Sequence, residues 1–430
     1  MTSQRPDPIA VLREQETHRL PWLLPIRHGR MAQSPLAFFR GAAAQMAIDL
    51  AWQPHSGVMV QLCGDAHLMN FGFYASPERT LVFGVNDFDE TLPGPYEWDL
   101  KRLLASVMLA ADSLGIAADD ARSIVRRSAR RYRQAHRDLL GLGYLDLWYH
   151  RVDVAAYREG VKHKPLRESL DAIAEQAQHN DNRRAARKLC QRDADGVLRF
   201  RHDPPLLWSL ESLASQGADP VALRRSVEQS IARYRASLRP EMQWLVGRYT
   251  VLDFALKTVG VGSVGTRCAI ALLQGRDDDD LLILQSKEAG ASVLEAHLGA
   301  STAGSPGERV VRGQRLIQTV SDSFLGWVEA APGGVASYWR QFRDWKAMVQ
   351  LENLDRDALA DYGELCAAVL AKAHARSGDG EAIAAHLEAM GDPDGLLADF
   401  AGAYADQSRA DHQRLVAAIA DGELQAQSLG

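Results

Sequence analysis

Apolar residues recur along this chain with two different spacings, which separate helical from strand-forming segments. Helical spacing predicts helices over residues 35–52, 98–115, 117–142, 220–238, 291–298, 308–320, 359–375, 381–390 and 396–419. Alternating or continuous apolar runs predict strands at 58–62, 81–85, 266–273, 281–285, 325–329 and 335–342, with a further strand beginning at Val251. Ser34 and Asp219 each precede a proline and are expected to cap the helices that follow them.

The order of these elements predicts a protein of the α+β class. Residues 1–250 are expected to be mostly helical around one short hairpin, and 143–248 within them are interpreted as a helical insert. Residues 251–335 are expected to form a compact β-rich unit. Residues 336–430 lead back to helices, and no internal repeat is visible.

Composition narrows the classes of function. Apolar residues make up 46% of the 430 residues, enough for a large buried core. No apolar run is long enough to predict a transmembrane helix, and the polar start of the chain does not resemble a secretory signal, so we expect a cytoplasmic protein. The net charge of −6 shows no basic bias toward nucleic acid. Four widely spaced cysteines without a C-x-x-C motif argue against a thiolate zinc site or a disulfide framework.

One local charge cluster departs from this average. Seven arginines lie between positions 122 and 137, within a single predicted helix. A solvated helix face is the favoured interpretation of this basic run. The alternative is a docking surface for an acidic partner or for a substrate that carries phosphate.

The densest polar chemistry lies between residues 61 and 90. Asp65, His67 and Asn70 follow the strand 58–62, and Asp87 and Asp89 follow the strand 81–85. A turn near residues 76–78 predicts a hairpin between the two loops, so that Asn70 and Asp87 can share a cation. Divalent cations such as Mg²⁺ take Asp and Asn oxygens. Which of Asp87 and Asp89 is the principal metal ligand stays open, and a polar turn is the alternative for either loop.

A second group of candidates lies about 200 residues further along the chain. The glycine turn 260–265, with Gly262, Ser263 and Gly265, joins two predicted strands, and its backbone N–H groups can approach phosphates. Lys287 ends the next apolar strand. A carboxylate should hold Lys287: Glu295 is the first candidate, with Glu288 and Glu308 as alternatives. A plain hairpin turn and a surface ion pair are the competing interpretations.

Asp99 opens the helix after the acidic loops, in the segment EWDL. We interpret it as a helix cap or as a brace for the first acidic loop. His374 and Asp379, at the end of a later predicted helix, could join the same site.

Nine segments together resemble one bacterial family, catalogued as domain of unknown function 2252. They are SPLAFFRG, CGDAHLMNFG, VNDFDET, EWDLKRLLAS, VGVGSVGTRC, LQSKEA, GQRLIQ, YWRQFRDWK and AHARSGD, spread over roughly residues 27–379. The family is similar to protein kinases and aminoglycoside phosphotransferases, whose catalytic loop has the form G-D-x-H-x-x-N. The resemblance implies a kinase-like bilobal fold with a small antiparallel β-rich lobe and a large, mostly helical lobe.

The order of the motifs differs from that of ordinary kinases. There the glycine loop and the lysine precede the catalytic loop, whereas here Gly262 and Lys287 follow Asp65 and Asp87. We therefore expect a circular permutation, with a hinge near residues 338–342. This hypothesis requires Lys287 to lie near Asp87 in space.

The resemblance implies an ATP- and Mg²⁺-dependent phosphotransferase acting on a hydroxyl-bearing small molecule or protein. Asp65 would position the acceptor hydroxyl, and His67 would support its loop. Metal ligands would come from Asn70, Asp87 and Asp89, and nucleotide contacts from Gly262, Ser263, Gly265, Lys287 and Arg340, with Glu295 holding the lysine. AMP transfer and a non-catalytic nucleotide-binding scaffold are the alternatives. The acceptor and the oligomeric state are not predicted from the sequence.

Overall fold

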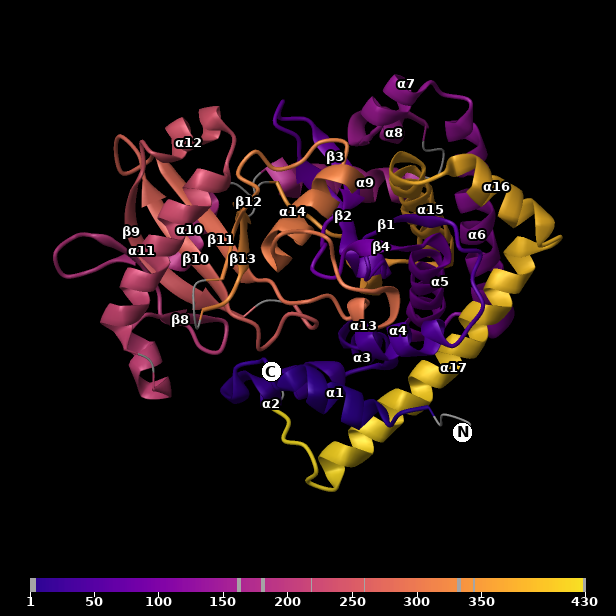
Figure 1. Ribbon diagram of the computed structural model, residues 1–430, viewed down its shortest axis with the longest axis horizontal. Helices are drawn as coiled ribbons and strands as arrows, with labels where there is room; N and C mark the ends of the chain where they lie inside the picture. The colour runs from indigo at the N-terminus through magenta and orange to yellow at the C-terminus, as the bar shows by residue number, and fades with distance from the viewer. Residues whose placement is uncertain are drawn as a thin grey trace.

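The computed structural model describes residues 5–160, 164–178, 182–217, 219–258, 260–330, 334–342 and 345–427. It is an α+β protein with antiparallel sheets, as the sequence predicts. Figure 1 shows a twisted sheet at one side and a group of long helices at the other. The acidic loops and the helix α14 lie between these two parts.

The main sheet has six strands, in the order β12-β13-β11-β10-β9-β8. Their bounds are β8 (Leu207–Ser209), β9 (Thr250–Lys257), β10 (Cys268–Gln274), β11 (Leu281–Glu288), β12 (Gly326–Val328) and β13 (Ser337–Gln341). All neighbours are antiparallel, and the register places Lys287 of β11 opposite Cys268 on one side and Tyr338 on the other. The predicted strand pair 266–273 and 281–285 is confirmed.

Two helical layers cover the sheet and bury its apolar side chains. On one face, α11 (Pro220–Ser237) and α12 (Pro240–Val246) share a core with the strands, in which Tyr234 stacks on Trp339 with ring centroids 5.2 Å apart. On the other face, α10 (Asn182–Leu189) packs on Ile270 and Ile283. Asp219 accepts hydrogen bonds from the backbone N–H groups of Val221 and Ala222, which confirms the predicted cap.

The segment 143–248 is not purely helical, contrary to the sequence prediction. It contains α7 (Tyr144–Tyr149), α8 (Val154–Gly160), α9 (Lys164–Gln178), α10, α11 and α12, but also β5 (Val152–Asp153), β6 (Cys190–Arg192), β7 (Leu198–Phe200) and β8. β5 pairs with the acidic hairpin, and β8 extends the main sheet. These strands have two or three residues each, too few for an apolar period to appear.

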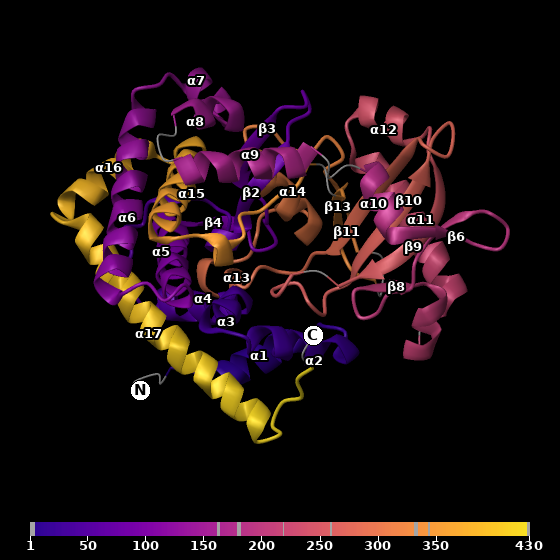
Figure 2. The same cartoon turned by 180° about the vertical axis from the view of Figure 1, so that it is seen from behind.

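The helical part is built around α5 (Tyr96–Ser113), α6 (Ala118–Leu140), α15 (Arg356–Ser377), α16 (Gly380–Ala389) and α17 (Pro393–Ala420). α5 is buried along most of its length because α6, α15 and α17 all pack against it. In Figure 2, α17 follows the outside of this group down to the N-terminal helix α1 (Pro8–Glu16). All five long helices lie where helical spacing predicts them.

The basic run of α6 packs against acidic residues of the same chain. Arg126 pairs with Asp392, Arg133 with Asp394, and Arg137 with Glu388. Arg122 and Arg127 make similar pairs with carboxylates of α15 and α17. The run is therefore a partly exposed seam between helices rather than the freely solvated face that its charge predicts. Such partly exposed pairs each contribute about 0–1 kcal/mol.

The N-terminal region forms four short helices, whereas the sequence predicts only one, over residues 35–52. They are α1, α2 (Leu24–Met31), α3 (Pro35–Gly41) and α4 (Ala43–Ala51). The predicted single helix 35–52 breaks at Ala42, whose φ of −111° and ψ of 37° are not helical. Ser34 caps α3 by accepting a hydrogen bond from the N–H of Ala37, as expected. Gly41 allows α2 to pack closely, because a Cβ there would lie 2.7 Å from the Met31 sulfur.

The acidic loops belong to two small sheets. β1 (Met59–Leu62) pairs with β4 (Leu92–Pro95), and β2 (Phe71–Ala75) forms the predicted hairpin with β3 (Leu81–Val85). The end of α15 lies against the start of β1, where the Ser377 hydroxyl accepts a hydrogen bond from the N–H of Gln61 at 3.1 Å. The helix that follows the main sheet therefore ends at the strand that enters the first acidic loop.

Between β11 and β12 the chain forms α13 (Glu295–Leu298) and α14 (Pro306–Ile317). Of the helix predicted at 291–298, only the last turn, α13, is helical in the structure. The proposed hinge at 338–342 falls mainly within β13, so the chain leaves the sheet only after Gln341. The four cysteines are buried free thiols, in line with the absence of a disulfide framework. Within the described ranges, none of the helices has the length and apolarity required to cross a bilayer.

Candidate active site

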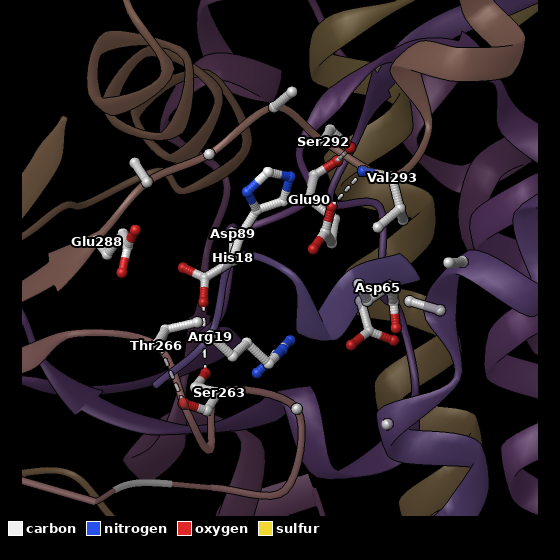
Figure 3. A pocket seen from close by; sticks show the side chains of 18 of the residues that line it. His18, Arg19, Asp65, Asp89, Glu90, Ser263, Thr266, Glu288, Ser292 and Val293 are labelled. Atoms are coloured by element: carbon white, nitrogen blue, oxygen red, sulfur yellow. Dashed lines mark hydrogen bonds between the residues drawn. The ribbon is translucent and has the colours of Figure 1, made fainter. Parts of the chain in front are cut away.

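A pocket of about 750 Å³ lies where the acidic loops, the glycine turn and the N-terminal helices meet. Figure 3 shows Ser263, Thr266 and Glu288 on one side of it and Asp65 on the other, with Asp89 and Arg19 between them. The predicted site residues that line it are Asp65, His67, Asn70, Asp87, Asp89, Gly262 and Ser263. Residues far apart in the sequence are thus brought to one cavity.

Lys287 joins the two halves of the site directly. Its Nζ lies 2.5 Å from Oδ2 of Asp89 and 3.3 Å from Oδ1 of Asp87. The hydroxyl of Tyr338, on the neighbouring strand, donates to Oδ1 of Asp89 at 2.6 Å. Burial opposes ionisation of Asp89, but the charge of Lys287 and the bonds from Lys287 and Tyr338 outweigh it and lower the pKa of Asp89 to about 2.

Asp87 differs from Asp89 although both contact the same lysine. Burial and then the negative charge of Asp89 raise the pKa of Asp87 above its ordinary value. Its carboxylate accepts bonds of 3.3 and 3.4 Å from Lys287 and one of 3.4 Å from the N–H of Asp89. Asp87 therefore has the weaker hydrogen bonds of the two carboxylates, and a cation in the pocket would neutralise its negative charge.

Asp65 is held in an ion pair with Arg102 of α5. Arg102 is buried and also donates to the carbonyl oxygen of Phe39 at 2.9 Å. Burial disfavours the Asp65 carboxylate, yet the charge of Arg102 and its hydrogen bond outweigh this and lower the pKa of Asp65. Asp65 is thus an ionised, oriented carboxylate at the pocket wall. Sequence reasoning gave no role to Arg102, which lies in the segment EWDLKRLLAS, 37 positions after Asp65.

His67 and Asn70 support the same loop. Burial lowers the pKa of His67 to about 3, so its imidazole is neutral at ordinary pH. Its Nδ1 accepts a hydrogen bond from the N–H of Met69 at 3.1 Å. The side-chain amide of Asn70 donates to the carbonyl oxygen of Asp65 at 2.7 Å, which leaves its own oxygen available to a cation.

Asp99 acts as a brace for the first acidic loop. Its carboxylate accepts hydrogen bonds from the N–H groups of Cys63 at 2.7 Å and Gly64 at 3.0 Å. Gly64 has a φ of +86°, and a Cβ there would lie 2.2 Å from the carbonyl oxygen of Glu90. His374 at the end of α15 lies 3.4 Å from Asp99, so it belongs to this support rather than to the pocket wall.

The glycine turn is held by arginines of the N-terminal segment. Arg19 donates to the carbonyl oxygen of Val264 at 2.5 Å, Arg27 to that of Gly262 at 2.9 Å, and Arg30 to that of Gly260 at 2.8 Å. Ser263 reaches back to Asp89, with 3.5 Å between Oγ and Oδ2. Gly265, with φ +94°, closes the turn outside the pocket lining. The turn is therefore fixed from outside, a feature with no signal in the sequence.

The structure does not bring Glu295 to Lys287. Glu295 lies 3.6 Å from the buried Arg309 and accepts hydrogen bonds from the N–H groups of Ser292 and Ser301. The alternatives Glu288 and Glu308 pair with Arg267 and Arg312. The partners of Lys287 are Asp87 and Asp89, so a helix glutamate is not required to neutralise it.

Arg309 and Arg340 lie behind the acidic loop. Arg309 donates to the carbonyl oxygens of Asp89 at 2.8 Å, Gly290 at 2.9 Å and Thr91 at 2.6 Å. Arg340, predicted as a nucleotide contact, bonds Gln285 at 3.1 Å and the carbonyl oxygen of Asn86 at 3.2 Å. It does not line the pocket. Sequence reasoning missed Arg309, whose bonds join the loop to α14.

No group of three or more His, Cys, Asp or Glu side chains within the described ranges is placed to hold a metal ion by itself. Asn70, Asp87 and Asp89 line one pocket, however, and offer amide and carboxylate oxygens. Mg²⁺ commonly takes only one or two protein carboxylates and completes its shell with water and substrate phosphates. The donor set fits a cation that arrives with a phosphate ligand.

The fold and pocket define an α+β protein in which a buried lysine and two carboxylates meet beneath a glycine turn. The chain belongs to the bacterial family described as "Uncharacterized protein conserved in bacteria (DUF2252)", whose model matches residues 19–418. No curated protein and no solved structure matches it. The family match spans the acidic loops, the glycine turn, Lys287 and the helices that support them.

Proposed function

We propose that this protein is an ATP- and Mg²⁺-dependent phosphotransferase with a kinase-like active site. The observation that carries the proposal is the position of Lys287, whose Nζ lies 2.5 Å from Asp89 and 3.3 Å from Asp87. In kinases a strand lysine contacts the nucleotide phosphates, and a nearby Asp holds the metal that bridges them. Those two groups must therefore be adjacent, as they are here.

The arrangement of elements favours the same interpretation. The glycine turn joins β9 to β10, and Lys287 lies on β11, the third strand of this series, as the kinase lysine lies on its third strand. α15 follows the sheet and ends at β1, where Ser377 contacts Gln61. If the chain continued from the end of α15 directly into β1, the acidic loops would follow Lys287 in the sequence. That is the order of the motifs in ordinary kinases. A circularly permuted kinase-like fold accounts for both observations.

Each residue has a role in this proposal. Asp87 and Asn70 would hold Mg²⁺, which neutralises charge on the phosphates. Lys287 would turn from Asp87 toward the phosphates, and its contact with Asp89 would keep it oriented. Asp65, ionised and fixed by Arg102, would orient the acceptor hydroxyl. The acceptor oxygen would form a bond to the terminal phosphorus as the bond to the leaving ADP oxygen breaks, and Asp65 would accept the proton of the acceptor hydroxyl. Catalysis would come mainly from positioning and charge neutralisation.

The test uses the full-length protein, Mg²⁺ and ATP labelled in separate experiments at the terminal or the α-phosphate, with a metabolite extract as acceptor source. Transfer of the terminal label, lost in Asp87→Asn and Lys287→Met, is the expected result. Glu241→Gln, at an exposed position on α12, is the control and should retain transfer. Transfer of the α-label would instead identify an AMP transferase. Calorimetry showing no Mg-ATP binding by the wild type, and no change in Asp87→Ala, would contradict both and favour a scaffold.

A further inference from the structure

Arg40 differs from the other arginines around the pocket. It lies near the end of α3 and lines the pocket together with Asp65 and the glycine turn. Its Nε is buried without a hydrogen-bond partner. Arg19, Arg27 and Arg30 each donate to a carbonyl oxygen of the glycine turn, whereas no described residue pairs with the guanidinium of Arg40.

The surroundings leave this charge uncompensated. Asp65 is the acidic group whose charge acts on Arg40, but the Asp65 carboxylate already forms an ion pair with Arg102. Burial lowers the pKa of Arg40, an effect that the charge of Asp65 only partly offsets. A guanidinium nevertheless stays protonated in proteins, so Arg40 carries a positive charge in a mostly desolvated position. A charge in such a position costs stability unless a counter-ion pairs with it.

The position of Arg40 indicates which counter-ion it would take. Its carbonyl oxygen lies 3.4 Å from where a Cβ on Gly262 would be, so the end of α3 touches the turn whose N–H groups can approach phosphate. Asp65 and Asp89 occupy the same pocket, which makes a carboxylate ligand without a cation unfavourable. A planar guanidinium binds phosphate oxygens through two parallel N–H bonds.

We propose that Arg40 binds the terminal phosphate of a nucleoside triphosphate in this pocket. The proposal rests on the function given above and adds a phosphate ligand from the N-terminal helices, outside both the acidic loops and the sheet. An arginine provided by the same chain can stabilise the charge that develops during phosphoryl transfer. Arg40 thus adds a positive charge from α3 to the pocket that Asn70 and Asp87 also line.

The first test is ligand binding by Arg40→Gln and Arg40→Lys, measured by calorimetry with three probes: Mg-ATP, inorganic triphosphate and adenosine. Loss of a charge-assisted pair should weaken Mg-ATP and triphosphate binding by about tenfold to a hundredfold in Arg40→Gln. Adenosine binding should not change. Arg40→Lys should lose less affinity than Arg40→Gln, because lysine keeps the positive charge but cannot form the two parallel hydrogen bonds. Arg225→Gln, on the exposed side of α11, is the matched control for loss of one positive charge.

The second test separates ligand binding from a structural role. Because no residue in the described ranges pairs with Arg40, Arg40→Gln should leave the thermal midpoint of the ligand-free protein unchanged or raise it. The upward shift that Mg-ATP causes in the wild type should shrink in the variant. A structural arginine would instead lower the midpoint without ligand, and that result would overturn the proposal.

The probes keep the two proposals apart. If the wild type binds Mg-ATP and Arg40→Gln binds it equally well, the role of Arg40 is wrong while the phosphotransferase proposal stands. If the wild type binds inorganic triphosphate through Arg40 but no ATP, the anion site stands and its nucleotide assignment fails together with the proposed function. Absence of binding to either triphosphate overturns the Arg40 proposal.

Discussion

Lys287 and Asp89 form an ion pair of 2.5 Å across 198 positions of sequence, and Lys287 is 2% exposed. This contact fixes the end of β11 against the second acidic loop. It also gives different roles to Asp87 and Asp89, the two carboxylates that contact Lys287. Asp89 is occupied by Lys287 and Tyr338, whereas Asp87 has longer bonds and a raised pKa. Asp89 is therefore mainly a positioning group, and Asp87 is the candidate metal ligand.

The first prediction tests this division with two single variants. Asp89→Asn should lower the free energy of unfolding by about 2 kcal/mol, since Lys287 keeps only Asp87 as counter-charge. Asp87→Asn should leave it unchanged or raise it slightly, because one of two like charges is removed. Mg²⁺-dependent nucleotide binding should be lost in Asp87→Asn. Urea unfolding and calorimetry measure the two effects, and equal behaviour of the variants would contradict the division.

The second prediction concerns Arg309, which holds three carbonyl oxygens near the pocket. Arg309→Met should lower the free energy of unfolding by about 3 kcal/mol, because buried acceptors lose charged donors. Arg312→Met on the same helix is the control, since its side chain is 66% exposed and should matter by less than about 1 kcal/mol. Chemical unfolding in urea gives both values. Similar losses in the two variants would argue against a special role for Arg309.

The third prediction concerns the brace formed by Asp99. Asp99→Ala leaves the N–H groups of Cys63 and Gly64 without acceptors in a buried position, so unfolding should become easier by about 3 kcal/mol. Amide hydrogen exchange should show faster exchange at these two positions. Asp112→Ala at the exposed end of α5 tests for general helix effects and should leave their exchange slow. Unchanged exchange in Asp99→Ala would refute the brace.

The fourth prediction is a pH dependence that originates in His67. Its pKa is about 3 in the folded protein and about 6.5 in an unfolded chain, so the unfolded state binds more protons between these values. Stability should therefore fall as the pH drops below 6.5, by about 1.4 kcal/mol per unit from this group alone. His67→Gln should flatten that slope. His202→Gln, at an exposed position, is the control and should keep the wild-type dependence of stability on pH. If His67→Gln also kept the wild-type dependence, His67 would be excluded as its source.

Local signals predicted much of the fold and part of the site. The spacing of apolar residues and the capping residues predicted the long helices and the paired strands. These elements depend mainly on residues within a few positions of one another. The hairpin β2–β3 likewise placed Asn70 and Asp87 in one pocket. The prediction of a single helix over 35–52 was wrong, because the backbone leaves the helical region at Ala42. Gly41, just before it, was a weak local signal of a helix end that the prediction passed over.

Long-range support could not be predicted in the same way. Arg102 reaches Asp65 across 37 positions, and Arg309 reaches Asp89 across 220 positions, with no local pattern that indicates either pairing. The choice of Glu295 failed for the same reason. Nearness in sequence favoured it, but its carboxylate serves Arg309 and two backbone N–H groups.

The sequence separation within the Lys287–Asp89 pair also sets an order of events during synthesis. At about 5–20 residues per second, the acidic loop leaves the ribosome about 10–40 s before Lys287 does. For that interval its carboxylates have no lysine counter-charge and no sheet to pack against. The part of the chain made before Lys287, which includes α5 and α6 but not α15 or α17, must therefore tolerate an open, solvated acidic hairpin. The pocket cannot close before β11 has been made.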